Sequence, residues 1–173
     1  MSKPAQTNLI LFLICIVLFA IAWFKPGLHK ETIKYFTSLE IDEIYSIEIQ
    51  REGLENIKLI KKDKVWFLLE PEQTAANILR INTIIALAKK RSYAQFQVSD
   101  KELDPYGLNA PKVSVKLNET DFVIGGKHPV KALRYAMKID KSSQSANQTI
   151  HLIEDKVYYQ LRSRLDTFIK KTL

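Results

Sequence analysis

The sequence predicts an α+β protein in which a mostly antiparallel sheet packs against two helices and is preceded by one transmembrane helix. One long, uncharged apolar run stands near the N-terminus of the 173-residue chain. Short segments that alternate apolar and polar residues fill most of the remainder, and such alternation is typical of half-buried strands. Two longer segments with helical periodicity follow strand-rich stretches, an order typical of the α+β class.

The apolar run reads LILFLICIVLFAIAWF, ends at Phe24 and contains no charge. With Thr7 and Asn8 it reaches 18 residues, close to the roughly 20 that a helix needs to cross the hydrocarbon core of a bilayer. We therefore expect a short tail over residues 1–7 and a membrane-spanning helix over residues 8–24, with the lipid bilayer as a partner. The residues expected to anchor the chain are Leu9, Phe12, Ile16, Phe19 and Trp23.

A cleaved signal peptide is the alternative to a membrane anchor, because Ala20 and Ala22 form an A-x-A pattern typical of cleavage sites. The apolar run is long for a signal peptide, which favours retention. The orientation of the anchor is also open. One lysine precedes the run and three follow it within ten residues, which would place the C-terminal side in the cytoplasm, but long domains translocate largely regardless of flanking charge.

A juxtamembrane linker over residues 25–38 is expected to lead into a soluble domain over residues 39–173. The first part of the domain reads as an antiparallel meander, with strands predicted at Ile44–Gln50, Ile57–Lys61 and Val65–Leu69. Pro71 ends the third strand, and a helix is predicted from Gln73 to Lys90 with Thr74 as its N-cap. The apolar stripe of that helix comprises Ile78, Ile81, Ile84, Ile85, Leu87 and Ala88.

The second part of the domain again consists of strands followed by a helix. The strands are predicted at Tyr93–Val98, Val113–Leu117, from Asp121 onward, Arg134–Ile139 and Thr149–Ile153. The polar stretch DKSSQSANQ, at 140–148, is expected to be a mobile loop. Asp155 is predicted to cap a final amphipathic helix, whose apolar face comprises Val157, Leu161, Leu165 and Phe168.

The stretch DPYGLNAP, at 104–111, is expected to be a shaped corner that sets the register of the following hairpin. Gly107 can take a positive φ at a turn. Pro111 favours an extended conformation at the residue before it. Tyr106 and Leu108 are then expected to fold back over the core.

The sequence offers little material for catalysis, and we expect no cofactor and no metal. The three histidines, His29, His128 and His151, lack the spacing of a zinc site. Cys15 is the only cysteine and lies inside the predicted membrane helix, so the domain has no thiol nucleophile. The glycine pair in IGGKHP, at 124–129, precedes no helical pattern, so a hairpin turn is expected there rather than a phosphate loop.

The net charge of +7, from 26 basic and 19 acidic residues, raises the question of nucleic acid. The basic residues are scattered along the chain and residues 39–55 are acidic, so no nucleic-acid-binding groove is predicted. We expect the basic residues to form a solvated surface, with attraction to anionic lipid head groups as a further use of this charge. The residues expected to contact a partner or an anion are Lys127, Lys131 and Arg134.

Several short motifs follow one another in a distinctive order along the domain. An I-x-I strand, a W-x-L-x-x-P element, a Y-G-L-x-x-P element and an I-G hairpin together resemble the bacterial domain-of-unknown-function 4340 family over about residues 40–165. The resemblance implies a bacterial inner-membrane protein whose domain faces the periplasm, similar in some members to auxiliary components of ABC-type transport systems. It implies no catalytic residues. The signature positions here are Trp66, Pro71, Tyr106, Gly107, Pro111 and Gly125.

These features together predict a non-catalytic, single-pass membrane-anchored accessory or assembly subunit of a bacterial inner-membrane protein complex. Its expected partners are the lipid bilayer and other integral membrane proteins. The alternative is a periplasmic module that binds a lipid, a glycan or a small anion and is linked to ABC-type transport. An enzyme is not expected, because no catalytic constellation stands out in the domain.

Overall fold

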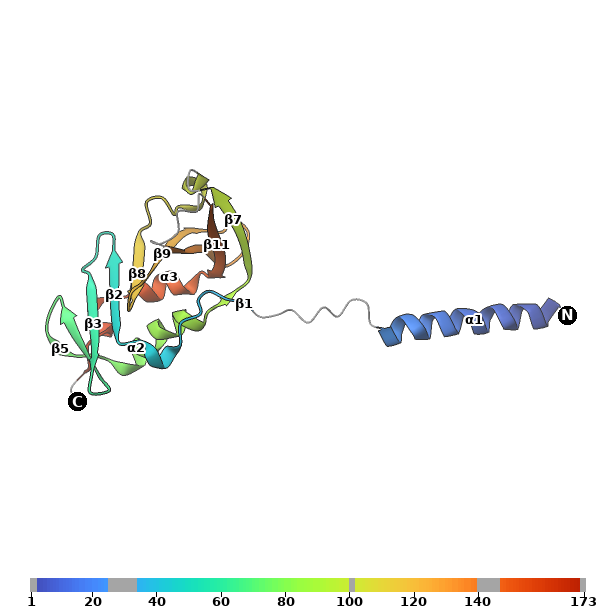
Figure 1. The fold of residues 1–173 in the computed structure, drawn as a ribbon, viewed down its shortest axis with the longest axis horizontal. Helices are drawn as coiled ribbons and strands as arrows, with labels where there is room; N and C mark the ends of the chain where they lie inside the picture. The colour runs from blue at the N-terminus through green and yellow to red at the C-terminus, as the bar shows by residue number, and fades with distance from the viewer. Residues whose placement is uncertain (1–2, 25–33, 100–101, 140–146, 172–173) are drawn as a thin grey trace. The chain divides into compact units, whose positions relative to one another are not determined.

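The computed structural model describes residues 3–24, 34–99, 102–139 and 147–171, and the chain divides into two compact units, Met1–Thr32 and Ile33–Leu173. The first unit contains helix α1, Lys3–Phe24 (Figure 1). Its segment Pro4–Trp23 has a mean hydropathy of 2.4 and is long and apolar enough to span a membrane or to serve as a signal sequence. The helix begins at Lys3, so most of the predicted tail is helical. Pro4 permits this because the first turn of a helix needs no amide donor.

The second unit begins before the predicted domain boundary at residue 39. Strand β1, Lys34–Tyr35, pairs with β6, Arg91–Ser92. The following residue, Phe36, is only 3% exposed and belongs to the main hydrophobic core. The last residues of the predicted linker are therefore part of the domain, because they carry a core side chain. Residues 25–33 of that linker lie outside the described residues.

Nine strands of the described chain form one sheet in the order β5-β4-β3-β2-β8-β9-β10-β11-β7 (Figure 1). All neighbours in this order are antiparallel. The strands are β2 Ser46–Arg51, β3 Ile57–Lys62, β4 Val65–Glu70, β5 Thr74–Ala75, β7 Ala94–Ser99, β8 Val113–Leu117, β9 Thr120–Lys127, β10 Leu133–Ile139 and β11 Asn147–Glu154. Of the predicted loop at 140–148, residues 140–146 lie outside the described residues and the last two belong to β11.

Two helices, α2 (Ile78–Ile85) and α3 (Lys156–Leu161), pack with one face of the sheet around the main core (Figure 1). Alternation along β2 buries Ile47 and Ile49 completely against this core, as its apolar pattern predicts. Full burial of each such side chain stabilises the fold by about 1.5–3 kcal/mol. The predicted α+β class is confirmed. Short 3-10 turns lie at Ile41–Glu43, Ala86–Lys89, Asp104–Tyr106 and Leu165–Thr167.

Helix α2 is shorter than predicted, and its N-cap is Asn77 rather than Thr74. The Oδ1 atom of Asn77 accepts a hydrogen bond from the Leu79 amide over 3.1 Å. Thr74 lies in β5 and pairs with Leu68 of β4, so sheet pairing overrides the helical pattern there. Ile78, which was predicted to be in the buried stripe, is 50% exposed because it lies in the first turn of the helix.

The final helix also ends early, at Leu161, and Asp155 occupies its N-cap position but forms no side-chain capping hydrogen bond. The Asp155 carboxylate forms an ion pair with Arg134 instead. Leu165 is half-buried and Phe168 is fully buried, but both follow the end of the helix. The segment after the helix turns back toward the core and brings both side chains to it. Their spacing in the sequence is therefore similar to that of residues on one face of a helix.

The opposite face of the sheet carries a smaller, second core on β7, β9, β10 and β11. The predicted corner at 104–111 covers this core, with Gly107 at a φ of 63°. Leu108 is buried, and the ring of Tyr106 lies 4.9 Å from that of Tyr135. The expected fold-back of the corner is confirmed. The buried members of the second core are Leu103, Leu108, Val123, Met137 and Ile150.

The glycine pair of the IGGKHP motif lies inside β9 and not in a hairpin turn, contrary to the prediction. A Cβ atom on Gly125 would lie 2.8 Å from the Leu108 side chain and closer still to the Tyr106 carbonyl oxygen. The strand must therefore present bare backbone where the corner packs on it. The turn itself follows at His128.

Candidate interaction site

The side chains that could carry chemistry are dispersed over the described part of the chain. No three His, Cys, Asp or Glu side chains among the described residues are arranged to hold a metal ion. The His128 ring lies in a turn, where its Nδ1 atom accepts hydrogen bonds from the amides of Val130 and Lys131. The His151 ring lies on β11 and contacts the Ser92 hydroxyl over 3.0 Å. Both imidazole rings thus form hydrogen bonds with neighbouring groups of the domain.

The predicted anion contact does not form a free cationic cluster. Arg134 is buried, and its Nε atom donates to Asp155 Oδ1 over 2.7 Å. The Nζ atom of Lys127 lies 3.6 Å from the other oxygen of the same carboxylate. Only Lys131 is left as an exposed charge without a described ion pair. An internal carboxylate therefore already faces two of the three cations, and a contact with a partner or an anion at these residues stays a prediction.

The predicted anchor residues all lie on α1 and present apolar surface. Between 48% and 75% of each side chain is exposed within this unit. The rings of Phe19 and Trp23 are neighbours, with centres 5.7 Å apart. Apolar area left in water costs about 25 cal/mol per Å², so a helix of this kind requires an apolar environment. The residues concerned are Leu9, Phe12, Ile16, Phe19 and Trp23.

The signature positions fall into two groups in the fold. The first group gathers at the corner, where residues 104–111 meet β9, and comprises Tyr106, Gly107, Pro111 and Gly125. The second group lies at the other end of the sheet order and comprises Trp66 and Pro71. Trp66 is buried in the main core, whereas Pro71 is exposed just beyond β4. The Trp66 position adjoins a groove.

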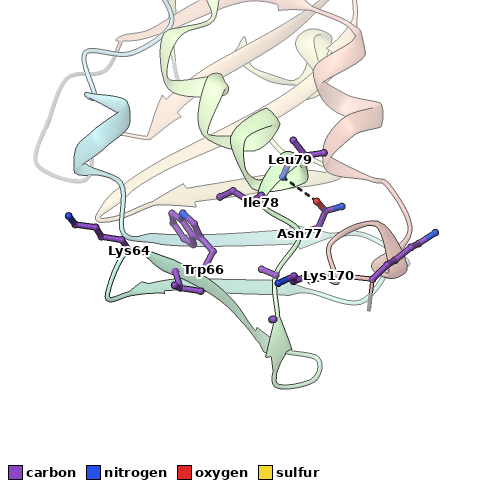
Figure 2. Close-up of a pocket in the computed structure, with 10 residues that line it drawn as sticks. Lys64, Trp66, Asn77, Ile78, Leu79 and Lys170 are labelled. Atoms are coloured by element: carbon purple, nitrogen blue, oxygen red, sulfur yellow. Dashed lines mark hydrogen bonds between the residues drawn. The ribbon is translucent and has the colours of Figure 1, made fainter. Parts of the chain in front are cut away.

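A groove near β5 is the candidate interaction site, and we call it the lysine-rimmed groove. It has a volume of about 510 Å³ and lies among β4, β5, the start of α2 and the C-terminal segment (Figure 2). Its lining residues are Lys64, Val65, Trp66, Ala75, Ala76, Asn77, Ile78, Leu79, Lys170 and Lys171.

Hydrogen bonds to the backbone fix the walls of the lysine-rimmed groove. The Asn77 amide donates to Phe168 O over 2.8 Å, and its side-chain Nδ2 donates to Thr167 O over 3.1 Å. The Lys170 amide donates to Ala75 O over 2.9 Å. These bonds join the C-terminal segment to β5 and α2. The groove is therefore preformed, and a ligand would not have to order it.

The apolar side chains of the groove are unusually exposed. Ile78 and Leu79 expose 50% and 75% of their surface, and Val65 exposes 52%. The first two lie in the first turn of α2, before the helix reaches the core. Figure 2 shows the Trp66 side chain close to Ile78. Neighbouring exposed apolar side chains with a polar rim are typical of interaction sites.

The rim of the groove is positively charged. Figure 2 shows Lys64 and Lys170 on opposite sides of Trp66, and Lys171 adds a third ammonium group. In the ranges that the structure describes, no carboxylate is paired with these three lysines. A ligand or partner segment that combines apolar surface with acidic groups would therefore complement both the apolar side chains and the lysines of the groove.

Two arginines, the buried Arg51 and the half-buried Arg80, hold the segment that leads to the groove. Arg51 Nη1 donates to Ser163 O over 2.6 Å, and Arg80 Nη2 donates to Gln160 O. These carbonyls lie at the C-terminal end of α3, where a helix lacks its own amide donors and attracts cations. Burial lowers the pKa of both guanidinium groups. The arginines act as a clamp for the C-terminal segment.

The sequence prediction missed the groove because three distant segments build it. One local pattern pointed to the groove. Asn77 is a typical helix N-cap residue, and it is followed directly by Ile78 and Leu79, two apolar residues that the first turn of α2 leaves exposed. The pairing of Lys170 with Ala75 has no local signal, because 95 residues separate the two segments.

Comparisons of the chain with protein-family models, with curated proteins and with solved structures find no match. The fold and the groove define a class: an α+β domain with a preformed, basic, apolar groove, carried in one chain with an apolar N-terminal helix. The resemblance to the domain-of-unknown-function 4340 family stays a prediction.

Proposed function

We propose that the chain is a non-catalytic, single-pass accessory or assembly subunit of a bacterial inner-membrane protein complex. The observation that carries this proposal is the combination of a candidate membrane span, Pro4–Trp23, with a separate compact domain. Twenty residues with a mean hydropathy of 2.4 match the thickness of a hydrocarbon core. The family resemblance supports the bacterial inner membrane and a periplasmic domain.

In this proposal, the lysine-rimmed groove receives a segment of a partner subunit. The exposed Leu79 and Val65 side chains provide an apolar contact area, and Lys64 and Lys170 favour acidic residues at its ends. Interfaces owe most of their energy to a few buried apolar and aromatic anchors. Leu79 is therefore the residue whose loss should weaken the complex most.

Affinity purification of the tagged full chain in mild detergent tests this function. We expect an integral membrane protein to co-purify in a fixed ratio with the wild type and to be lost with Leu79→Glu. The matched control is Val130→Glu, because Val130 is 87% exposed and lies in the β9–β10 turn. A wild-type chain that purifies as a monodisperse monomer without another membrane protein would contradict the proposal.

A cysteine-labelling experiment tests the periplasmic location. Tyr159 is 59% exposed on α3, so Tyr159→Cys in a Cys15→Ser background offers a single accessible thiol. A membrane-impermeant maleimide should label it in intact spheroplasts. Labelling only after lysis would place the domain in the cytoplasm instead.

The second candidate function is a periplasmic binding module for a lipid linked to ABC-type transport. The lysine-rimmed groove favours it, because about 510 Å³ with an apolar floor and a basic rim suits an anionic amphiphile better than a glycan. Native mass spectrometry of the purified full chain distinguishes the two. A bound lipid that is lost in Leu79→Glu, with no co-purifying protein in either sample, would support the binding module.

A further inference from the structure

Helix α1 is apolar all round, but its two faces carry different kinds of side chain. Successive residues of a helix are about 100° apart around its axis, so positions separated by three or four residues share one face. One face carries β-branched residues at this spacing, and each of them is between 49% and 58% exposed within this unit. We call this face the β-branched seam, and it comprises Ile10, Ile14, Val17 and Ile21.

The opposite face of α1 carries three aromatic residues. Each residue of this face follows a seam residue by two positions, which is about 200° around the axis. The rings of Phe19 and Trp23 lie on it with their centres 5.7 Å apart, and aromatic rings near a helix end are typical of the membrane–water interface. A helix that contacted only lipid would need no such separation of side-chain types. The aromatic face comprises Phe12, Ile16, Phe19 and Trp23.

The β-branched seam has the spacing of a coiled coil. Its residues are separated by four, three and four positions, as positions a and d of a heptad are. A shallow apolar hollow of about 280 Å³ lies on the seam, and its lining includes Ile10 and the residues three, four and seven positions further on. Residues at these offsets form the hole that receives a side chain from a facing helix. The lining residues are Ile10, Leu13, Ile14, Val17 and Leu18.

The side chains of the β-branched seam are suited to packing in a membrane. Helices in a bilayer associate mainly through van der Waals packing. Valine and isoleucine keep one strongly preferred χ1 rotamer in a helix, so packing them costs little side-chain entropy. The small residues Ala20 and Ala22 do not belong to the seam. Its heptad spacing therefore predicts a left-handed pair of helices that cross at about 20°.

We propose that the β-branched seams of two copies of this chain pair in parallel within the membrane and make the protein a homodimer. All copies of a single-pass chain cross the bilayer in the same direction, so identical residues lie at the same depth. Equal positions of the two seams therefore meet from Ile10 to Ile21, over about 17 Å. A helix of another protein would need the same spacing at the same depth. The proposal rests on the membrane span of the proposed function, but not on the partner subunit or on the lysine-rimmed groove.

Cysteine cross-linking of the full chain in its native membrane tests the proposal, in a Cys15→Ser background. Ile14→Cys and Ile16→Cys are a matched pair, because the two isoleucines are 49% and 48% exposed and lie on opposite faces of α1. A lipid-soluble oxidant should convert most of Ile14→Cys to a disulfide-linked homodimer and leave Ile16→Cys monomeric. Absence of the Ile14→Cys homodimer, equal cross-linking at both positions, or a cross-link of Ile14→Cys to a different protein would overturn the proposal.

Energy transfer between donor-labelled and acceptor-labelled full chains in lipid vesicles provides a second measurement, with the labels on Tyr159→Cys in the same background. Val17→Phe places a ring in the seam and should weaken association about tenfold through overpacking. Phe19→Val makes the reverse exchange on the aromatic face and should leave association unchanged. No energy transfer with the seam intact, an unchanged association in Val17→Phe, or an equal loss in both variants would overturn the proposal.

Extraction of the membranes with alkaline carbonate separates this proposal from the proposed function. The full chain and each variant should stay in the membrane pellet. Release into the supernatant would contradict the membrane span and overturn both proposals. Chains that stay embedded but do not cross-link would overturn the self-association alone, because the partner subunit is proposed to bind the lysine-rimmed groove.

Discussion

The Nε atom of Arg134 lies 2.7 Å from Oδ1 of Asp155, and this ion pair joins β10 to the start of α3. Both side chains are about nine-tenths buried. The Nη1 atom of Arg134 also donates to Gly125 O over 2.9 Å, and its guanidinium lies 3.9 Å from the centre of the Tyr158 ring. The domain therefore supplies the hydrogen-bond and ion-pair partners of the Arg134 guanidinium group.

Breaking that pair from one side should destabilise the domain. Asp155→Asn is expected to lower the free energy of unfolding by about 3 kcal/mol, because it leaves the buried Arg134 charge uncompensated. Lys131→Ala removes a nearby exposed charge and should change stability by less than about 0.5 kcal/mol. Urea unfolding of the full chain in detergent measures both. Equal stability of the two variants would contradict a structural role for Asp155.

The contact between the corner and β9 predicts a steric effect at Gly125. Gly125→Ala should cost about 1–3 kcal/mol through overpacking against Leu108 and the Tyr106 carbonyl. Gly53→Ala is the control, because Gly53 has a φ of 71° but nothing within 4 Å of its Cβ position. It should cost only the backbone strain, about 1 kcal/mol. Thermal unfolding compares the two, and a smaller loss at Gly125 would refute close packing of the corner.

The buried surroundings of His151 predict a pH dependence. Burial lowers the pKa of this imidazole, so the unfolded chain, with an ordinary histidine pKa of about 6.5, binds the proton more readily. Its contribution to stability is present above about pH 6.5 and is lost as the pH falls below that value. His151→Gln should flatten the fall in urea midpoint between pH 7.5 and 5.5. An unchanged fall in this variant would contradict the assignment.

The side chain of Asn118, in the turn between β8 and β9, should contribute to the stability of the domain. Its Oδ1 atom accepts hydrogen bonds from the amides of Tyr45 and Ser46, and its Nδ2 donates to Glu43 O over 2.9 Å. Its φ is 53°, which glycine adopts without strain. Asn118→Gly therefore isolates the lost hydrogen bonds and should cost about 1–3 kcal/mol. Chemical unfolding measures this, and a neutral effect would show that these bonds add nothing to stability.

The strands were predictable because their signals are local. Val113–Leu117 alternates apolar and polar residues between Pro111 and a two-residue turn, and β8 has these same bounds. The helix bounds were less predictable, because tertiary pairing decides them. Thr74 and Ala75 have a helical context, but they pair with β4.

Most of the candidate site could not be predicted from local sequence patterns. The prediction grouped Lys127, Lys131 and Arg134 by proximity in sequence, but the Asp155 carboxylate that neutralises two of them arrives from the end of another strand. The lysine-rimmed groove depends on contacts between β5 and the C-terminal segment. Such long-range contacts cannot be read from spacing alone.

The most direct test of the central claim is photo-cross-linking in intact cells with a photoreactive amino acid at Leu79. A subunit that docks through the lysine-rimmed groove should give one defined adduct with an integral membrane protein. The same probe at Val130, which is also highly exposed, should not give it. No adduct at Leu79, or the same adducts at both positions, would contradict the account.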